Sequence, residues 1–186
     1  RVYTEDQVPG QEGHLVRRNF AGGDYFRALG IDLVQGRVFT NDEAITPNTS
    51  ILVSRSAAAK LWPGQEPIGR RLRRVIGKDT VSFTVVGVVA DVKQDDWRQQ
   101  GEETVYFALT GHTAAAYGMG SPAYVVKSSR AELMKDDVRR LVREYAPEAP
   151  VYREFTMAFL ARRSMIQLSF TMLTLGVVSV LALVLG

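Results

Sequence analysis

The residue types that most often carry catalysis or bind metal ions are scarce in this chain of 186 residues. His14 and His112 are its only histidines, and they lie far apart, with no acidic residue or cysteine at ligand spacing. Cysteine is absent, so the chain forms neither a disulfide nor a thiolate metal site. The sequence therefore assembles no zinc site and no catalytic triad.

No nucleophile or phosphate-binding loop stands out either. The G-x-S-x-G motif of serine hydrolases is absent, so we expect Ser54, Ser82 and Ser121 to have structural roles. Gly77 and Lys78 form a Gly-Lys pair, but the upstream glycine and the Ser or Thr of a phosphate-binding loop are missing. We expect that the chain is not an enzyme and that it binds no ATP, metal or other cofactor itself.

Acidic residues gather after the most apolar part of the chain. Asp91, Asp95 and Asp96 could outline a calcium-binding loop. Their spacing does not fit the EF-hand pattern, so a solvated acidic loop is the favoured interpretation.

Basic residues exceed acidic ones only slightly, 23 against 20. The densest basic cluster comprises Arg70, Arg71, Arg73 and Arg74 around Leu72. Its partial alternation fits the solvent face of a strand or turn, and contact with lipid headgroups or nucleic acid is the alternative. So mild an excess does not predict a nucleic-acid partner.

The hydrophobic pattern predicts strands and helices in mixed order. Residues 50–53 predict a strand that leads into a helix over residues 54–62, with Ser54 as its N-cap. Residues 81–92 form the clearest strand, and its two apolar faces predict a central position in a sheet. Gly87 within it indicates a bulge or a close backbone approach. A short helix over residues 25–29 should end at Gly30.

The second half of the chain predicts fewer strands. We expect strands at residues 104–109, 123–127 and 151–155, and a helix at residues 130–145. Residues 110–122, rich in Gly, Ala and Thr, predict a flexible loop. Thr156 should begin a helix that continues without a break into the residues that follow.

Residues 165–186 carry no charge, and this length is close to the roughly 20 residues that a helix needs to cross a bilayer. We therefore predict a water-soluble domain over residues 1–160 and a membrane helix over residues 161–186. The chain begins with Arg1 and ends within the apolar pattern, so we expect it to belong to a longer protein. The residues expected within the membrane are Met165, Leu168, Phe170, Leu173, Leu175, Val178, Leu181, Leu183 and Leu185.

Four ordered blocks of sequence resemble the extracytoplasmic core domain of MacB/FtsX-type ABC transporter permeases. They are YFRALGI (25–31) with GRVF (36–39); ILVS (51–54), AKLWPG (59–64) and PIGR (67–70); FTVVGVVAD (83–91); and VYFAL (105–109). Departures are small: Ser54 or Arg55 stands where an Asn is common, and Ala108 replaces the usual proline. The resemblance covers most of the chain.

This resemblance implies an α+β, mixed-sheet domain with a porter-like lobe at about residues 123–155 and an inserted second lobe at about residues 20–110. It implies a permease subunit of the inner membrane, in a homodimer or paired with a second permease. A separate cytoplasmic ATPase, which binds the ATP, would drive motion of the extracytoplasmic domain, a coupling called mechanotransmission, to export or extract a substrate that the sequence does not identify.

Two alternatives stay open. The chain could instead be a membrane-tethered binding or sensor module, in which the helix only anchors a ligand-binding domain. In addition, Arg162 and Arg163 directly precede the uncharged run, and the positive-inside rule applied locally would place residues 1–160 in the cytoplasm. The family resemblance places them outside it.

Overall fold

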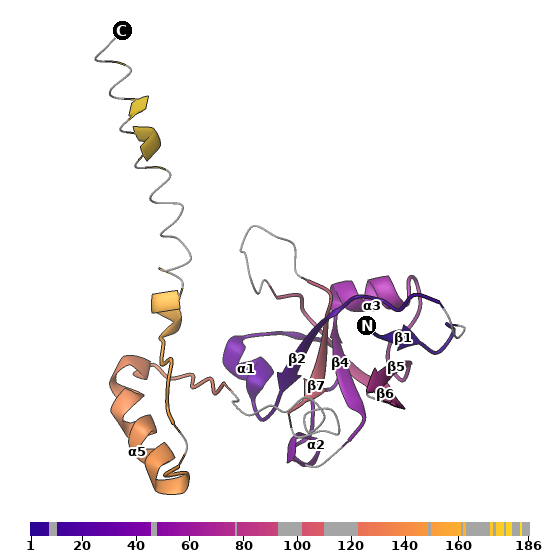
Figure 1. The fold of residues 1–186 in the computed structure, drawn as a ribbon, viewed down its shortest axis with the longest axis horizontal. Coiled ribbons are helices and arrows are strands. Elements are labelled where there is room, and N and C mark those ends of the chain that lie inside the picture. Colours follow the sequence, from indigo (N-terminus) through magenta and orange to yellow (C-terminus); the bar gives the residue numbers. More distant parts are fainter. Residues whose placement is uncertain are drawn as a thin grey trace. The chain divides into compact units, whose positions relative to one another are not determined.

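The computed structural model describes residues 1–7, 11–45, 48–76, 78–92, 102–109, 123–148, 150–160, 162, 172, 174–176, 178–179 and 183. Contacts within the chain divide it into two compact units, Arg1–Val126 and Lys127–Gly186 (Figure 1). Each unit is described by itself. The assignment of residues 20–110 and 123–155 to the two lobes of the family stays a prediction.

A mixed sheet of seven strands forms the first unit. Six strands lie side by side in the order β1-β5-β6-β4-β7-β2. The seventh strand, β3, pairs with β6 outside this order. The β4–β6 and β2–β7 pairs are parallel and the others antiparallel. The strands are β1 (Tyr3–Thr4), β2 (Arg17–Ala21), β3 (Leu33–Gly36), β4 (Ser50–Ser54), β5 (Arg71–Ile76), β6 (Asp79–Val89) and β7 (Thr104–Ala108). The predicted α+β class with a mixed sheet is confirmed.

Apolar side chains cover both faces of this sheet. Along β4, Ile51 and Val53 lie in one core cluster and Leu52 in the other, as the alternation of a strand requires. Helix α3 (Arg55–Leu61) packs its Ala57, Ala58 and Leu61 into the first cluster. Helix α1 (Tyr25–Leu29) packs Phe26 into the second. The strand–helix pair that the sequence predicts at residues 50–62 therefore forms and closes one face.

Strand β6 is central, as predicted, but its two faces are not those that strict alternation gives. Phe83, Val85 and Val88 belong to the first cluster, whereas Val86 and Val89 belong to the second. The register with β4 shifts between Ile51 and Leu52, where Val85 and then Gly87 are the partners. This irregularity moves the later side chains by one position, so Val89 does not share the face of Phe83 as strict alternation would require.

The arginine cluster is not simply a solvent face. Arg74 is only 6% exposed and lies on the same face of β5 as the buried Leu72. Its guanidinium carbon is 5.8 Å from the centre of the Phe107 ring. Burial, with the nearby Arg18, lowers the pKa of Arg74 to about 10. The interpretation of all four arginines as solvated is therefore wrong at Arg74, because the pleat of β5 points this side chain inward.

The second unit is built around helix α5 (Lys135–Tyr145), which follows a 3₁₀ turn at Ala131–Met134. This agrees with the helix predicted at residues 130–145. The strands predicted at residues 123–127 and 151–155 are wrong: the structure describes these residues, and they form no strand. A strand requires a partner for its backbone groups, and no strand pairing involves these residues in the described part of the chain.

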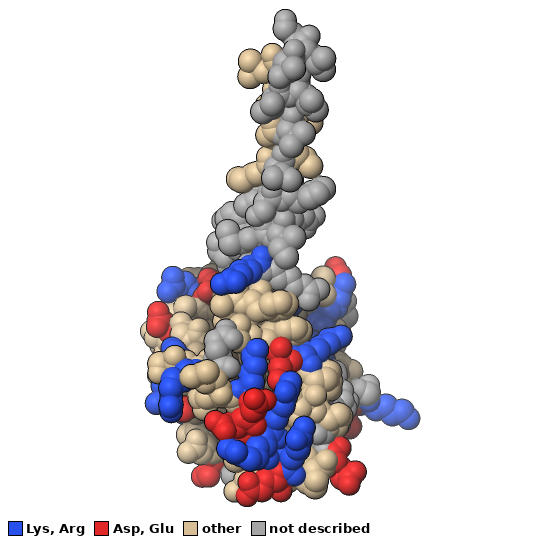
Figure 2. Space-filling model, turned by 90° about the vertical axis from the view of Figure 1, so that its left-hand side faces the viewer, with Lys and Arg blue, Asp and Glu red and all other residues tan. Residues whose placement is uncertain are grey.

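Charges of both signs mix on the surface. Lys and Arg side chains lie among Asp and Glu side chains on the face shown in Figure 2. This arrangement is typical of a solvated protein surface and does not resemble a nucleic-acid footprint.

Candidate functional site

Ser54 and Asp91, two residues of the first unit that the sequence marks as candidates for a functional role, both make defined polar contacts. The Ser54 hydroxyl accepts hydrogen bonds from the backbone N–H groups of Ala57 (3.2 Å) and Thr104 (2.9 Å). Ser54 thus caps α3 and joins it to β7 from a fully buried position. These contacts give the side chain a structural role.

Asp91, the first of the three aspartates in the possible calcium loop, lies against the same helix. Its carboxylate accepts from the backbone N–H of Ser56 at 2.9 Å and from the Ser56 hydroxyl at 2.7 Å. A carboxylate in this place satisfies an N–H of the first turn of α3 and complements the positive end of the helix. Asp95, Asp96 and His112 lie outside the described residues. No group of three or more His, Cys, Asp or Glu residues that could hold a metal ion occurs within the described part of the chain.

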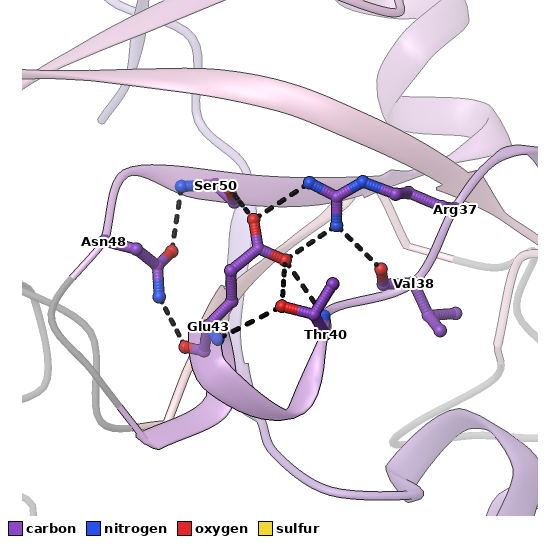
Figure 3. A network of polar contacts seen from close by, with 6 residues as sticks. All are labelled: Arg37, Val38, Thr40, Glu43, Asn48 and Ser50. Atoms are coloured by element: carbon purple, nitrogen blue, oxygen red, sulfur yellow. Dashed lines mark hydrogen bonds and ion pairs between the residues drawn. The ribbon is translucent and has the colours of Figure 1, made fainter.

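The most connected polar network joins the end of β3, helix α2 (Asn41–Ile45) and the start of β4 (Figure 3). We call it the Arg37–Glu43 clamp. The two guanidinium nitrogens of Arg37 donate to the two carboxylate oxygens of Glu43 at 2.6 and 2.9 Å. Such a bidentate pair fixes both direction and distance. The whole clamp comprises Arg37, Val38, Thr40, Glu43, Asn48 and Ser50.

Within the clamp, Thr40 and Glu43 form a capping box. The backbone N–H of Thr40 donates to Glu43 at 2.9 Å, and the Glu43 N–H donates to the Thr40 hydroxyl at 3.2 Å. The Ser50 hydroxyl donates to the second Glu43 oxygen at 2.6 Å. The roles of Arg37 and Glu43 were not predicted from the sequence. The T-x-x-E spacing from Thr40 to Glu43 is the signal that could have identified the glutamate.

These hydrogen bonds hold Glu43 ionised. Bonding to Arg37 is the main cause that lowers the pKa of Glu43 to about 2, and the Ser50 hydroxyl and Thr40 backbone contribute. These contacts join the end of β3, helix α2 and the start of β4, and we therefore assign the clamp a structural role.

The second unit holds a polar contact of a different kind, where the chain returns along α5. Arg139 of α5 donates from Nε to a Glu154 carboxylate oxygen at 2.7 Å. Two residues later, the Thr156 hydroxyl accepts from the N–H of Phe159 at 3.2 Å, which caps the helical residues 157–160. The helix start predicted at Thr156 is confirmed. The contact between Arg139 and Glu154 is not visible in the sequence pattern, because the two residues lie on separate elements.

Stacked aromatic rings accompany this helix start. Phe155 and Phe159 have ring centres 5.5 Å apart and planes 4° from parallel. We call residues 150–160, with their contact to α5, the junction. The junction is thus defined by an ion pair, a helix cap and a pair of stacked rings.

The residues predicted to lie within the membrane follow the junction. Leu175, Val178 and Leu183 are helical, and each is more than 60% exposed. Met165, Leu168, Phe170, Leu173, Leu181 and Leu185 lie outside the described residues. Among the residues that the structure describes, no helix is long and apolar enough to cross a membrane.

Comparisons with known proteins give one broad match. The family model described as the MacB-like periplasmic core domain matches residues 3–148. No curated protein matches the chain.

Solved structures with a related arrangement include two transporter domains. The periplasmic region of MacB from Actinobacillus actinomycetemcomitans is 19% identical, with a TM-score of 0.46, over 67% of this chain. This chain covers 54% of that protein, so it spans about half the length of the MacB region. The extracellular domain of the noncanonic ABC-type transporter YknZ from Gram-positive bacteria is 19% identical, with a TM-score of 0.49, over 75% of this chain and 69% of that one.

Proposed function

Because the chain belongs to the family of MacB-like periplasmic core domains, we propose that it is the extracytoplasmic part of an ABC transporter permease. The observation that carries this proposal is the family match over residues 3–148. The absence of an assembled catalytic group among the described residues is compatible with a mechanical role, in which ATP is bound and hydrolysed by a separate cytoplasmic ATPase.

In this proposal the domain moves when the ATPase moves the membrane helices. The junction supports the idea because it gives the chain a defined path from α5 to a capped helix. Arg139 and Glu154 hold residues near the helix start against α5, and the Thr156 cap fixes where the helix begins. Tilting that helix would then move α5 with it. We propose that two permease chains act together and that the movement serves export or extraction of a substrate that is not yet identified.

The first experiment tests the ATPase partner. The full-length protein is purified in mild detergent from its native membrane, and co-purifying proteins are identified by mass spectrometry. We expect a P-loop ATPase whose hydrolysis disappears when its phosphate-binding lysine is replaced. Absence of any ATPase under several mild detergents would instead favour a tethered binding module.

A second experiment tests the location. Residues 1–186 contain no cysteine, so Tyr145→Cys introduces the one thiol of this segment at a side chain that is 79% exposed, in a protein from which any cysteine outside the segment has been removed. We expect a membrane-impermeant maleimide to label this variant in intact spheroplasts. Labelling only after the membrane is broken would place the domain in the cytoplasm, as Arg162 and Arg163 suggest when the positive-inside rule is applied locally.

A further inference from the structure

Large apolar side chains are exposed along the junction to a degree that a water-facing surface does not explain. Singly exposed apolar residues are normal, but here six occur within ten residues. Phe155 is 45% exposed, Met157 65% and Phe159 49%. The full set is Val151, Tyr152, Phe155, Met157, Phe159 and Leu160. The chain therefore presents an apolar surface in its second unit, immediately before the uncharged run.

The contacts of the junction hold this surface in place. Thr156 caps the helix, Phe155 and Phe159 stack in parallel, and Glu154 is bonded to Arg139. Two aromatic rings fixed against each other across a helix start form a compact apolar patch. Ordering these side chains in advance lowers the entropy cost of burying them in another medium.

The segment that carries the patch has more basic than acidic residues. Residues 151–163 contain three arginines and one acidic residue. The acidic residue is Glu154, and its contact with Arg139 of α5 engages its charge. Arg153 and Arg162 are both exposed, one on each side of the aromatic pair. The segment thus combines aromatic rings with cations, and residues 165–186, which carry no charge, follow it.

Aromatic and basic side chains beside an uncharged run are the combination found at the boundary of a bilayer. Aromatic rings favour the headgroup level, and the long arginine side chains reach the lipid phosphates. We propose that residues 151–162 lie in the membrane–water interface, with Phe155 and Phe159 among the lipid glycerol groups and Arg153 and Arg162 against lipid phosphates. This inference rests on the proposed function in one respect, namely that the chain is attached to a membrane.

The interface has a mechanical consequence. If the patch is seated in the headgroup region, Glu154 and Arg139 tie α5 to the bilayer surface as well as to the helix. Movement of the membrane helix would then pivot α5 about the lipid surface rather than shift it freely in water.

The test uses spin labels on the full chain in phosphatidylcholine vesicles that contain phosphatidylglycerol. Single cysteines are introduced as Phe159→Cys, Leu175→Cys and Tyr145→Cys, one in each protein, because the chain has no native cysteine. Each label is then exposed to oxygen, which partitions into lipid, and to a nickel complex, which stays in water. We expect the label at position 159 to be severalfold less accessible to nickel than the label at position 145.

Each outcome supports or overturns the inference. A label at position 159 that is as accessible to nickel as the one at position 145, while position 175 is in lipid, overturns the interface but leaves the membrane attachment intact. If position 175 is also accessible to nickel, the membrane attachment, and with it the proposed function, fails. Protection of position 159 from both oxygen and nickel shows a protein partner on the patch and also overturns the lipid interface.

A charge variant tests the phosphate contact separately. Combining Arg162→Gln with Phe159→Cys should raise the nickel accessibility of the label, whereas Arg162→Lys should leave it close to that of the parent. The effect should be larger in vesicles with phosphatidylglycerol than in phosphatidylcholine alone, because anionic lipid strengthens the attraction of each cation. Equal accessibility for the Gln and Lys variants in both lipids would contradict a role for Arg162.

Discussion

At the scale of single residues, the charge of Glu43 has a specific task, because the clamp is organised around its carboxylate. Arg37, Thr40 and Ser50 all donate to it, and its pKa is lowered from 4.5 to about 2. Its ionised form is therefore more stable in the folded protein than in the unfolded chain. This makes Glu43 a source of stability that depends on pH.

We predict that Glu43→Gln lowers the free energy of unfolding by about 1–2 kcal/mol at pH 7. The full value of the pKa shift is not expected, because half of the Arg37 side chain is exposed and solvent screens the pair. Urea denaturation of the two proteins measures the difference. The exposed Glu148→Gln serves as control and should change stability little.

The difference in free energy of unfolding between wild type and Glu43→Gln should decrease as the pH falls. Since the folded pKa of Glu43 lies below the unfolded one, its contribution is complete above about pH 4.5 and is lost as the pH falls toward 2. The gap between wild type and Glu43→Gln should therefore narrow over this range. A gap that stays constant down to the lowest pH at which both fold would contradict the assignment.

Gly87 is the second residue with a specific physical task, because β3 approaches β6 closely there. A Cβ atom at position 87 would lie 2.2 Å from the carbonyl oxygen of Arg37. We predict that Gly87→Ala costs at least about 2 kcal/mol, since the backbone of one strand must move. The control is Gly64→Ala: Gly64 has φ +70°, but a Cβ there has no atom within 4 Å, so only about 1 kcal/mol of backbone strain is expected. Equal losses in thermal stability for the two variants would show that the backbone at Arg37 can make room for a methyl group at position 87.

At the scale of elements, the Ser54 hydroxyl connects α3 to β7. Removing this hydroxyl tests how strongly one side chain holds the two elements together. Ser54→Ala leaves the buried N–H groups of Ala57 and Thr104 without this acceptor, and we predict a loss of about 2–3 kcal/mol. Amide exchange should accelerate at Thr104 in particular. Ser56→Ala is the comparison: the Ser56 backbone still donates to Asp91, so a loss below about 1 kcal/mol is expected. Unchanged exchange at Thr104 in Ser54→Ala would contradict the connecting role.

Elements in the first unit could be predicted from sequence because their signals are local. The β-branched run of β6, the cap at Ser54 and the left-handed Gly30 each act within a few residues of chain. The exchange of faces along β6 could not be predicted, since it depends on the register with β4. The inward direction of Arg74 is also a property of the sheet, because the basic character of residues 70–74 alone favours water.

In the last third of the chain, the sequence predicts the helix correctly but also predicts strands that do not form. Residues 123–127 and 151–155 have the composition of strands but form none in the described structure, because β-propensity cannot supply a pairing partner. Helix α5 needs no partner for its backbone, and its end at Tyr145 is predicted correctly, whereas the first predicted residues form a 3₁₀ turn at Ala131–Met134. Of the junction, the Thr156 cap is a local signal, whereas the bond between Arg139 and Glu154 depends on how two elements meet.

For the whole molecule, the sequence identifies the family more directly than it identifies any site. The blocks around residues 25–39, 51–70, 83–91 and 105–109 coincide with structural needs: the C-cap at Gly30, the approach at Gly87, the cap at Ser54 and the buried strand β7. Their order along the chain specifies a fold. A catalytic motif would specify chemistry, and the proposed mechanical function requires none within this domain.

That mechanical function makes a prediction about chain continuity. Inserting about six Gly and Ser residues between Phe155 and Thr156 should separate the helix start from α5, because such a linker absorbs movement. In the proposed complex of two permease chains with an ATPase, we expect hydrolysis to persist while the ATP-dependent change in distance between spin labels at position 145 of the two chains disappears. An insertion of the same length between Gly111 and His112, in the first unit, should preserve that change. If the insertion before Thr156 also preserves it, the domain does not receive its movement through the junction, and the coupling must run through another part of the permease.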